Sequence, residues 1–330
     1  MTPRTRTFRI LAAGAAVMIG AAACSGGGRQ KETDASVSGG NAAGSSGYTI
    51  AFITHETPGD TFWDKVKNGA NQAAKDTGVT LKYSNDPEAP KQAVLIQNAV
   101  DSKVNAIATT LVTPDALAGS VKAATDAGIP VVGFNSGLDQ YQKLGALMYF
   151  GSDETLAGTT AGQRLAQQGA KHPLCVIQQT GSVALEARCA GVKSSIAGTE
   201  NIQVNGADDA AVTSTLQAKL AQDKSIDAIV TLGAPQALDA IKAKEQSGSE
   251  AKLVTFDLNE QAATEIKNGN ILFSIDQQPY VQGYMAVTSL YLNLKNGNDI
   301  GGGKAVLTGP SFVDSGNIDK IIPFTKNNTR

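Results

Sequence analysis

Several short segments of the sequence combine carboxylates, amides, an arginine and a pair of aromatic residues, and each segment follows an apolar run. These segments are residues 54–61, 135–136, 153–154, 179–188, 233–235, 257–259 and 276–279. Carboxylate and amide oxygens accept hydrogen bonds from hydroxyl groups, an arginine donates two in one plane, and aromatic faces stack on apolar C–H surfaces. The combination indicates a pocket for a neutral, hydroxyl-rich ligand.

The apolar runs alternate with segments of helical spacing. In residues 62–77 apolar side chains recur three or four residues apart, and Gly78 follows as a stop signal. We expect strands at residues 50–53, 79–83, 106–111, 129–134, 174–178, 201–204, 227–232, 252–256 and 271–275. We expect helices at residues 62–77, 91–100, 114–127, 155–169, 183–197, 210–222, 235–246, 260–267 and 280–296.

Repeated strand–helix–strand units predict parallel sheets that are covered by helices on both faces. The units form two runs, split near residues 148–153, so the sequence predicts an α/β fold with two doubly wound, Rossmann-like lobes. Ligands bind beyond the carboxyl ends of the strands in such sheets. The polar segments are the loops at those ends, so this fold would bring their side chains together.

Size and charge exclude several classes of protein. The chain has 330 residues, enough for about two domains. Its 28 Lys and Arg residues and 30 Asp and Glu residues leave a formal net charge of -2, without the basic surface that nucleic-acid binding needs. Two histidines and three cysteines argue against a zinc module or a scaffold of several disulfides. We therefore expect no nucleic-acid partner, no metal and no cofactor.

The first residues predict export. Arg4, Arg6 and Arg9 precede an uncharged run of 14 residues, 10–23, which is shorter than the roughly 20 residues of a membrane-spanning helix. A basic start, a short apolar core and small residues at its end are typical of a signal peptide.

A cysteine follows the signal directly. Small residues lead to Cys24, and the arrangement resembles a bacterial lipobox, in which the cysteine becomes the lipidated first residue of the mature protein. An ordinary signal peptide with an incidental cysteine is the alternative. We expect residues 1–23 to be the signal peptide and residues 24–47, which are rich in Gly, Ser, Ala and Asn, to be a flexible tether.

The remaining two cysteines are Cys175, in a strand-like run, and Cys189, in the helical segment after it. Two cysteines in an exported chain favour a disulfide. Closing so short a loop would stabilise the fold by about 3 kcal/mol. Two buried free thiols are the alternative.

Motifs of common enzyme classes are missing from the sequence. It contains no G-x-S-x-G nucleophile elbow and no G-x-x-x-x-G-K-[ST] phosphate loop, because residues 301–304 are followed by Ala305 and lack the earlier glycine. His55 and His172 are far apart and show no ligand-type spacing. We expect a protein that is not an enzyme.

Short motifs along most of the chain form a recognisable set. They are Phe62-Trp63 with Gly69-Ala70, Gly128-Ile129-Pro130-Val131-Val132, Gly151-Ser152-Asp153 with Gly158, Arg188 with Gly191, Phe256-Asp257, and Asp276-Gln277-Gln278-Pro279 with Gly283. From about residue 48 to 320 the chain resembles a type I periplasmic substrate-binding protein of the ribose and simple-sugar group, which serves an ABC importer. The lipobox points to an actinobacterial member.

The resemblance implies a domain organisation. An N-terminal lobe would comprise residues 48–152 plus 278–309, and a C-terminal lobe residues 153–277 plus 310–330. The chain would cross between the lobes near residues 152, 277–278 and 309–311. The lobes would then close about this hinge and bury a ligand between them.

The resemblance also assigns roles in the N-terminal half. Phe62 and Trp63 match the aromatic residues that sandwich a sugar ring, with core packing as the alternative. Asn135 stands where the family has an aspartate that accepts sugar hydroxyls. Ser136 replaces a frequent arginine, and Glu154 occupies a common asparagine position.

Three further positions match family residues of the second lobe and the hinge. Arg188 matches an arginine that reaches the ligand, and a surface ion pair with Glu186 or Asp209 is the alternative. Asp257 matches a carboxylate that accepts hydroxyl hydrogens, and it could also be a helix N-cap. Gln277 matches a glutamine that contacts the ligand beside the hinge.

Two departures from the ribose-type pattern put ribose itself in doubt. Gly233-Ala234 stands where ribose-type binders often carry Asn-Asp, which removes polar side chains and opens space. The loop of residues 55–60 is longer, so His55 and Asp60 could supply polar contacts, with local loop structure as the alternative for His55.

The function that follows from the resemblance is solute capture. We expect an exported lipoprotein, anchored to the outer face of the cell membrane through Cys24, that binds a monosaccharide or polyol and delivers it as a monomer to an ABC transporter permease. The alternative is a ligand-sensing module that reports a sugar or a furanose autoinducer to a sensor kinase or chemoreceptor. A sugar-responsive repressor would need a helix-turn-helix head where the export signal lies.

Overall fold

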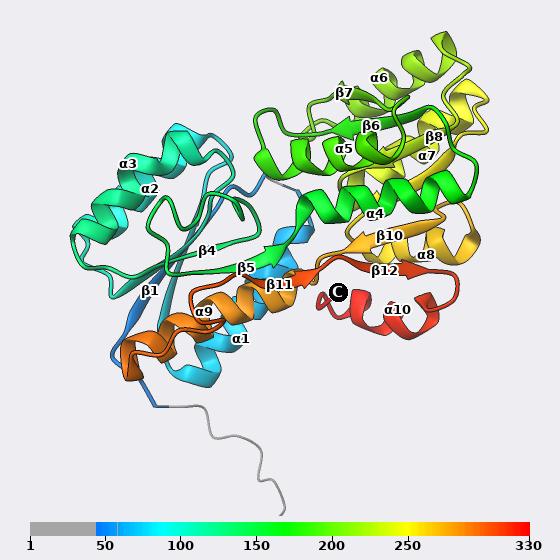
Figure 1. Cartoon of the computed structure of the whole chain (residues 1–330). Coiled ribbons are helices and arrows are strands. Elements are labelled where there is room, and N and C mark those ends of the chain that lie inside the picture. The colour runs from blue at the N-terminus through cyan, green and yellow to red at the C-terminus, as the bar shows by residue number, and fades with distance from the viewer. Residues whose placement is uncertain (1–43, 58) are drawn as a thin grey trace, which may run out of the picture. The chain divides into compact units, whose positions relative to one another are not determined.

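The chain forms two β-sheets, and helices cover both faces of each, as is usual for parallel sheets (Figure 1). The computed structural model describes residues 44–57 and 59–330, which all lie in one compact unit. The predicted signal peptide, Cys24 and most of the predicted tether lie outside the described residues. Within them, no helix is both long enough and apolar enough to cross a membrane.

The first sheet has the strand order β11-β5-β4-β3-β1-β2, and all its neighbouring strands are parallel. The strands are β1 (Thr49–Thr54), β2 (Thr80–Asn85), β3 (Ala106–Thr110), β4 (Val131–Phe134), β5 (Met148–Ser152) and β11 (Val306–Gly309). One face packs against α1 (Phe62–Thr77) and α9 (Pro279–Asn296), the other against α2 (Ala89–Asp101) and α3 (Pro114–Asp126). We call this assembly the N-terminal lobe.

The second sheet has the order β12-β10-β9-β8-β6-β7. Its strands are β6 (Pro173–Ile177), β7 (Glu200–Gln203), β8 (Ala228–Thr231), β9 (Lys252–Phe256), β10 (Phe273–Asp276) and β12 (Ser311–Asp314). One face packs against α4 (Glu154–Gln167) and α5 (Val183–Ser195), and the other against α6 (Asp209–Gln222), α7 (Ala234–Ser247), α8 (Glu260–Asn268) and α10 (Ile318–Lys326). We call this assembly the C-terminal lobe.

The predicted fold class is confirmed. All predicted helices and strands are present, with ends shifted by three residues or fewer. The sequence did not predict the strands β5, β11 and β12 or the helix α10. One pairing also departs from the expected parallel sheets, because β12 runs antiparallel to β10. That strand returns from the other lobe through a single residue, Pro310, and so enters the sheet edge in the reverse direction.

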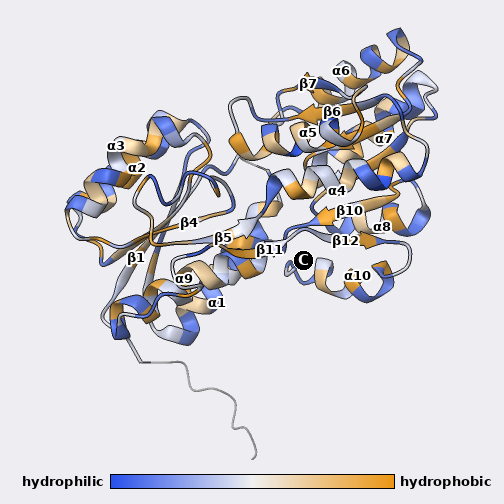
Figure 2. Ribbon diagram, in the orientation of Figure 1, coloured by the Kyte–Doolittle hydropathy of each residue, from blue (hydrophilic) through white to orange (hydrophobic). Residues whose placement is uncertain are grey.

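Successive side chains of a strand pack alternately into the cores on the two faces of the sheet. In β1, Ile50 and Phe52 pack on the side of α1 and α9, whereas Ala51 and Ile53 pack on the side of α2 and α3. Figure 2 shows the resulting pattern, with hydrophobic strands inside and hydrophilic outer faces on the helices. Burial on both faces explains why these strands read as continuous apolar runs.

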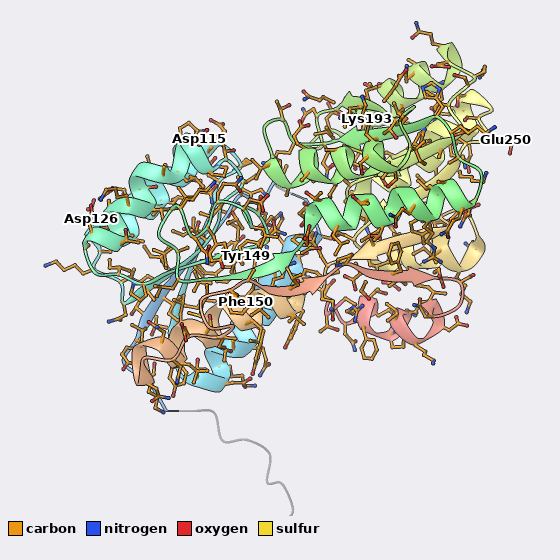
Figure 3. The ribbon with its side chains drawn as sticks, viewed as in Figure 1. Asp115, Asp126, Tyr149, Phe150, Lys193 and Glu250 are labelled. Carbon is orange, nitrogen blue, oxygen red and sulfur yellow. A yellow bond between two sulfur atoms is a disulfide. The ribbon has the colours of Figure 1, made fainter. Side chains whose placement is uncertain are left out.

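Three crossings join the lobes. They follow β5 at Ser152, follow β10 at Gln277 and connect β11 to β12 through Pro310. Figure 3 shows Tyr149 and Phe150 on β5, just before the first crossing. Both side chains are fully buried, in the opposite cores of the N-terminal lobe.

The predicted disulfide is present. Cys175 of β6 is bonded to Cys189 of α5, with 5.8 Å between their Cα atoms. Both residues are fully buried, and the bridge ties β6 to α5, the elements on either side of the loop at residues 178–182. The last residues of the predicted tether contact the N-terminal lobe. Ser46 donates from its backbone N–H to the carbonyl oxygen of Gly78 at 2.8 Å.

Glycines let one pair of helices in each lobe approach closely. A Cβ on Gly283 of α9 would lie 2.0 Å from the carbonyl oxygen of Val66 in α1. A Cβ on Gly158 of α4 would lie 2.0 Å from the carbonyl oxygen of Arg188 in α5. Each helix that follows a crossing therefore packs backbone to backbone against the helix that carries binding-site residues.

These contacts predict the effect of adding one methyl group. Gly283→Ala and Gly158→Ala should each lower the free energy of unfolding by about 1–3 kcal/mol, because backbone atoms must move apart. Gly119→Ala is the matched control, since Gly119 lies in α3 with open space around it, and it should raise stability by about 0.5–1 kcal/mol. Urea unfolding measures all three, and equal effects at the three sites would contradict the packing argument.

Candidate functional site

The carboxyl ends of both sheets border one cavity of about 590 Å³. Eight of the ten predicted ligand residues line it: His55, Asp60, Phe62, Trp63, Asn135, Arg188, Asp257 and Gln277. They come from loops after β1, β4, β9 and β10, from the first turn of α1 and from the second turn of α5. The parallel strands thus bring together side chains that are up to 222 residues apart in sequence.

The N-terminal lobe contributes an aromatic wall. Phe62 and Trp63 begin α1, lie 5.1 Å apart by ring centroids and meet edge to face. Both are almost fully buried and belong to the core as well as to the cavity lining. The alternative of core packing is therefore realised, and the end of this core forms one wall of the cavity. Stacking of the two rings on a sugar stays a prediction.

His55 extends this wall as a neutral side chain. Its ring meets Trp63 edge to face at 4.8 Å, and its Nδ1 lies 2.8 Å from Oγ1 of Thr110. Burial lowers the pKa of His55 to about 3. Gln92 donates to the same Oγ1 at 3.0 Å. The Thr110 hydroxyl can then donate to Nδ1 and leave the Nε2–H of His55 as a donor.

Asn135 and Asp257 occupy equivalent places in the two lobes. Each follows the fourth strand of its sheet, has a left-handed backbone (φ 64° and 62°) and donates its N–H to the next strand, at Phe150 and Ile275. Asparagine and aspartate tolerate this conformation better than most residues. Both side chains are only 7% exposed.

Gln277 at the second crossing joins these two residues. It donates from Nε2 to Oδ1 of Asp257 at 2.9 Å and accepts at Oε1 from Nδ2 of Asn135 at 3.2 Å. Gln282 of α9 donates to the same Oε1 at 3.0 Å. This chain of hydrogen bonds runs from one lobe to the other. Within the described part of the chain, it leaves Oδ1 of Asn135 and Oδ2 of Asp257 able to accept from a ligand.

Asp257 carries a strongly perturbed carboxyl group. Burial raises its pKa to about 7, although the charge of Arg188 and the hydrogen bond from Gln277 oppose the shift. The alternative role as an N-cap is wrong, because Asn259 caps α8 by accepting from the N–H of Ala262. A ligand hydroxyl that donates to Asp257 would favour its charged form.

Arg188 is buried rather than on the surface, so the alternative of a surface ion pair is wrong. Its Nε and Nη2 donate to the two carboxylate oxygens of Glu154 at 2.6 and 3.1 Å, and Nη1 donates to the carbonyl oxygen of Leu232. The guanidinium also lies 4.5 Å from the ring centre of Phe256. Burial opposes its charge, but Glu154 outweighs burial and raises the pKa of Arg188.

Two predicted residues, Ser136 and Glu154, do not line the cavity. The left-handed turn at Asn135 directs the next residue into the protein, where Ser136 is fully buried. Glu154 is buried behind Arg188, and its carboxylate is committed to that side chain. Its place in the structure is that of a positioning residue for the arginine.

Asp60 and Lys65 add charge near the aromatic wall. Burial raises the pKa of Asp60, whose Oδ1 accepts from the N–H of Phe62 at 3.0 Å. Lys65 is 1% exposed, donates to the carbonyl oxygen of Thr61 and has its pKa lowered by burial. The lysine lies outside the cavity lining, so its charge acts from behind the site.

The sequence missed several lining residues of the C-terminal lobe. They are Gln178, Asn205, Asp208, Asp209 and Gln236, together with Ser182 and Leu185, which lie in the predicted segment 179–188 but were given no role. The loop at residues 205–209 follows β7, so the rule on strand ends would have identified it. Gln178 and Gln236 gave no such signal, because one ends a strand-like run and the other lies within a helical segment.

One surface cluster has the composition of a metal site. His172, Glu200 and Asp223 place ligand atoms within 4.8 Å of one another on the C-terminal lobe. The Nζ of Lys219 already lies 2.6 Å from Glu200 and 3.6 Å from Asp223. An ammonium group therefore balances the negative charge there.

The fold and the cavity define a class of protein, that of two-lobed α/β proteins that bind a small molecule between their lobes. Residues 50–299 match the family model described as periplasmic binding protein domain. The chain belongs to this family. Its curated relatives are binding proteins of sugar transport and not enzymes.

The chain is similar to several individual proteins. The chain is 27% identical to the xylose/arabinose-binding protein XylF of Sulfolobus acidocaldarius, over 83% of this chain and 73% of that one. It is 26% identical to the ribose import binding protein RbsB of Haemophilus influenzae, over 73% and 82%. A carbohydrate transporter structure from Acidothermus cellulolyticus, in complex with myo-inositol, is 55% identical, with TM-score 0.85 over 86% of this chain and 99% of that one.

The perturbed carboxyl group predicts a dependence of stability on pH. The folded pKa of Asp257, about 7, lies above the ordinary value of 3.8, so its favourable contribution is present below pH 4 and is lost as pH rises to 7. Asp257→Asn should therefore stabilise the protein at pH 8 by roughly 2–4 kcal/mol and change it little at pH 4. Chemical unfolding at both pH values measures this difference.

Asp139→Asn is the control for that experiment, because Asp139 is exposed. It should leave the free energy of unfolding unchanged within about 0.5 kcal/mol at either pH. A destabilised Asp257→Asn protein at pH 8 would contradict the assignment of a desolvated carboxylate.

Proposed function

We propose that this protein captures a neutral cyclitol or monosaccharide between its lobes and delivers it to an ABC transporter permease. The observation that carries the proposal is the cavity itself. It presents aromatic rings from one lobe and a buried arginine and carboxylate from the other, around a chain of amide hydrogen bonds. Such a set of donors, acceptors and apolar faces suits a ring that carries many hydroxyls.

Myo-inositol is the first ligand to test. The relative whose structure was solved in complex with myo-inositol is 55% identical over nearly its whole length, against 27% for XylF and 26% for RbsB. The charges of the cavity also suit an uncharged ligand, because Arg188 is already paired with Glu154 and His55 is neutral. A ligand carboxylate or phosphate would not find an unpaired guanidinium or imidazolium at these two positions.

Binding closes the lobes in this proposal. Asp257 and Arg188 reach the ligand from the C-terminal lobe, and Asn135 and Trp63 reach it from the N-terminal lobe. The ligand favours closure to the extent that it binds the closed form more tightly than the open form. The permease recognises the closed form, and an affinity in the micromolar range or tighter corresponds to about -8 kcal/mol or better.

The protein acts outside the cytoplasm as a lipid-anchored monomer. Support comes from the basic, apolar start of the chain and the small residues before Cys24. Mass spectrometry of the mature protein tests the anchor, since a diacylglycerol-modified Cys24 at the new N-terminus is the expected species. An unmodified N-terminus elsewhere would contradict it.

Ligand binding has a built-in reporter. Trp63 is the one tryptophan of the chain and lines the cavity, so its fluorescence should change on titration with the bound solute. We expect myo-inositol or a closely related polyol to bind, and a saturating dose near 100 Kd to stabilise the protein by about 2.7 kcal/mol. Arg188→Ala and Asp257→Ala should weaken binding by about 10- to 100-fold, because each removes a hydrogen bond to a charged group.

Asp139→Ala is the matched control and should bind like the wild type. The panel contains inositols, pentoses, hexoses, other polyols and amino acids. Binding of an amino acid alone, or of no member of the panel, would contradict the proposed function and leave only the fold.

A further inference from the structure

The space beside Gly233 is occupied by the side chains of two glutamines. A Cβ on Gly233 would lie 2.6 Å from Oε1 of Gln236 and 3.1 Å from Nε2 of Gln178. The two amide groups therefore share the position that a side chain at residue 233 would take. The backbone of Gly233 is extended (φ -162°), a conformation that any residue adopts. A glycine is therefore needed here for the room it leaves and not for its backbone conformation.

A second glycine, Gly206, lies against the other end of the Gln178 side chain. A Cβ on Gly206 would lie 2.8 Å from the Cβ of Gln178, and Gly206 donates its N–H to the carbonyl oxygen of Gln178 at 3.1 Å. Gln178 thus lies with Gly206 close to its Cβ and Gly233 close to its amide. We call the space between the two glycines the glutamine slot.

The two glutamines of the slot have unused hydrogen-bonding capacity beside the cavity. Gln178 and Gln236 both line the cavity, and Gln236 is only 5% exposed. Oε1 of Gln178 is buried and has no hydrogen-bond partner among the described residues. The amide of Gln236 donates to the carbonyl oxygen of Gly206 only at a long 3.5 Å. A buried acceptor without a partner is costly unless a ligand supplies the donor.

We propose that Gln178 and Gln236 form a hydroxyl-recognising subsite on the C-terminal lobe, and that Gly233 sets its specificity by leaving room for both amides. This inference rests on the proposed function and names the ligand chemistry at one edge of the same cavity. An amide offers both a donor and an acceptor, so the pair selects an uncharged ring edge with adjacent hydroxyls. A site built to bond a hydroxyl rejects an analogue that lacks it, because its polar groups are then left unpaired.

Gly233→Ala tests the subsite. The added methyl group meets only the flexible ends of two side chains, so the fold should survive while both amides are displaced. Titration of Trp63 fluorescence with myo-inositol, its stereoisomers and monodeoxy-inositols should show at least tenfold weaker binding of the preferred inositol. Gly119→Ala is the control with open space around the new methyl group and should bind like the wild type.

Gln178→Met tests the same subsite without filling the slot. The wild type should reject one or more monodeoxy-inositols by at least tenfold relative to the parent inositol, and Gln178→Met should lose most of that discrimination. In the Gln178→Met background, Gly233→Ala should cost less affinity than it does alone. A merely structural role of Gln178 would weaken all inositols equally.

The outcomes separate this inference from the proposed function. A wild type that binds no inositol and no sugar contradicts the proposed function, and the subsite falls with it. A wild type that binds, together with Gly233→Ala and Gln178→Met proteins that keep its affinity and its rank order of ligands, overturns the subsite alone.

Discussion

The side chains of Asn135, Asp257 and Gln277, at the carboxyl ends of the two sheets, are almost fully removed from water, so each must find a partner in the protein or in a ligand. The chain Asn135–Gln277–Asp257 satisfies this constraint across the second crossing. It also determines which atoms stay available, because Nδ2 of Asn135 and Nε2 of Gln277 donate within the protein, whereas Oδ1 of Asn135 and Oδ2 of Asp257 can accept from a ligand. The site is therefore prepared for ligand hydroxyl groups before other features select among them.

The same constraint explains the backbone around the site. Left-handed residues follow the fourth strand of each lobe, and a third, Gln278 (φ 55°), begins α9 at the second crossing. Such conformations persist where the surrounding structure enforces them. The buried pair of Arg188 and Glu154 follows the same requirement for partners, since an unpaired guanidinium at that depth would be strongly destabilising. Close helix pairs at Gly158 and Gly283 keep these groups in register.

Much of the fold and part of the candidate site could be predicted from the sequence. Alternation of apolar runs and helical spacing located the strands that are buried on both faces, and the rule on strand ends located Asn135 and Asp257. The strands β11 and β12 were not predicted because they are short and half-exposed, with no sustained pattern of apolar residues. Glu154 and Gln178 show the other limit. Whether a carboxylate faces a ligand or an arginine, and whether a glycine opens empty space or room for a neighbour, depends on contacts between distant elements.

The most direct test of the central claim is a crystal structure of the protein grown with myo-inositol, or with the solute that the fluorescence titration selects. The account predicts one ligand ring between the two lobes, packed against Trp63, with hydroxyl groups donating to Asp257 and Asn135 and accepting from Arg188. A ligand bound to one lobe only, or outside this cavity, would contradict it.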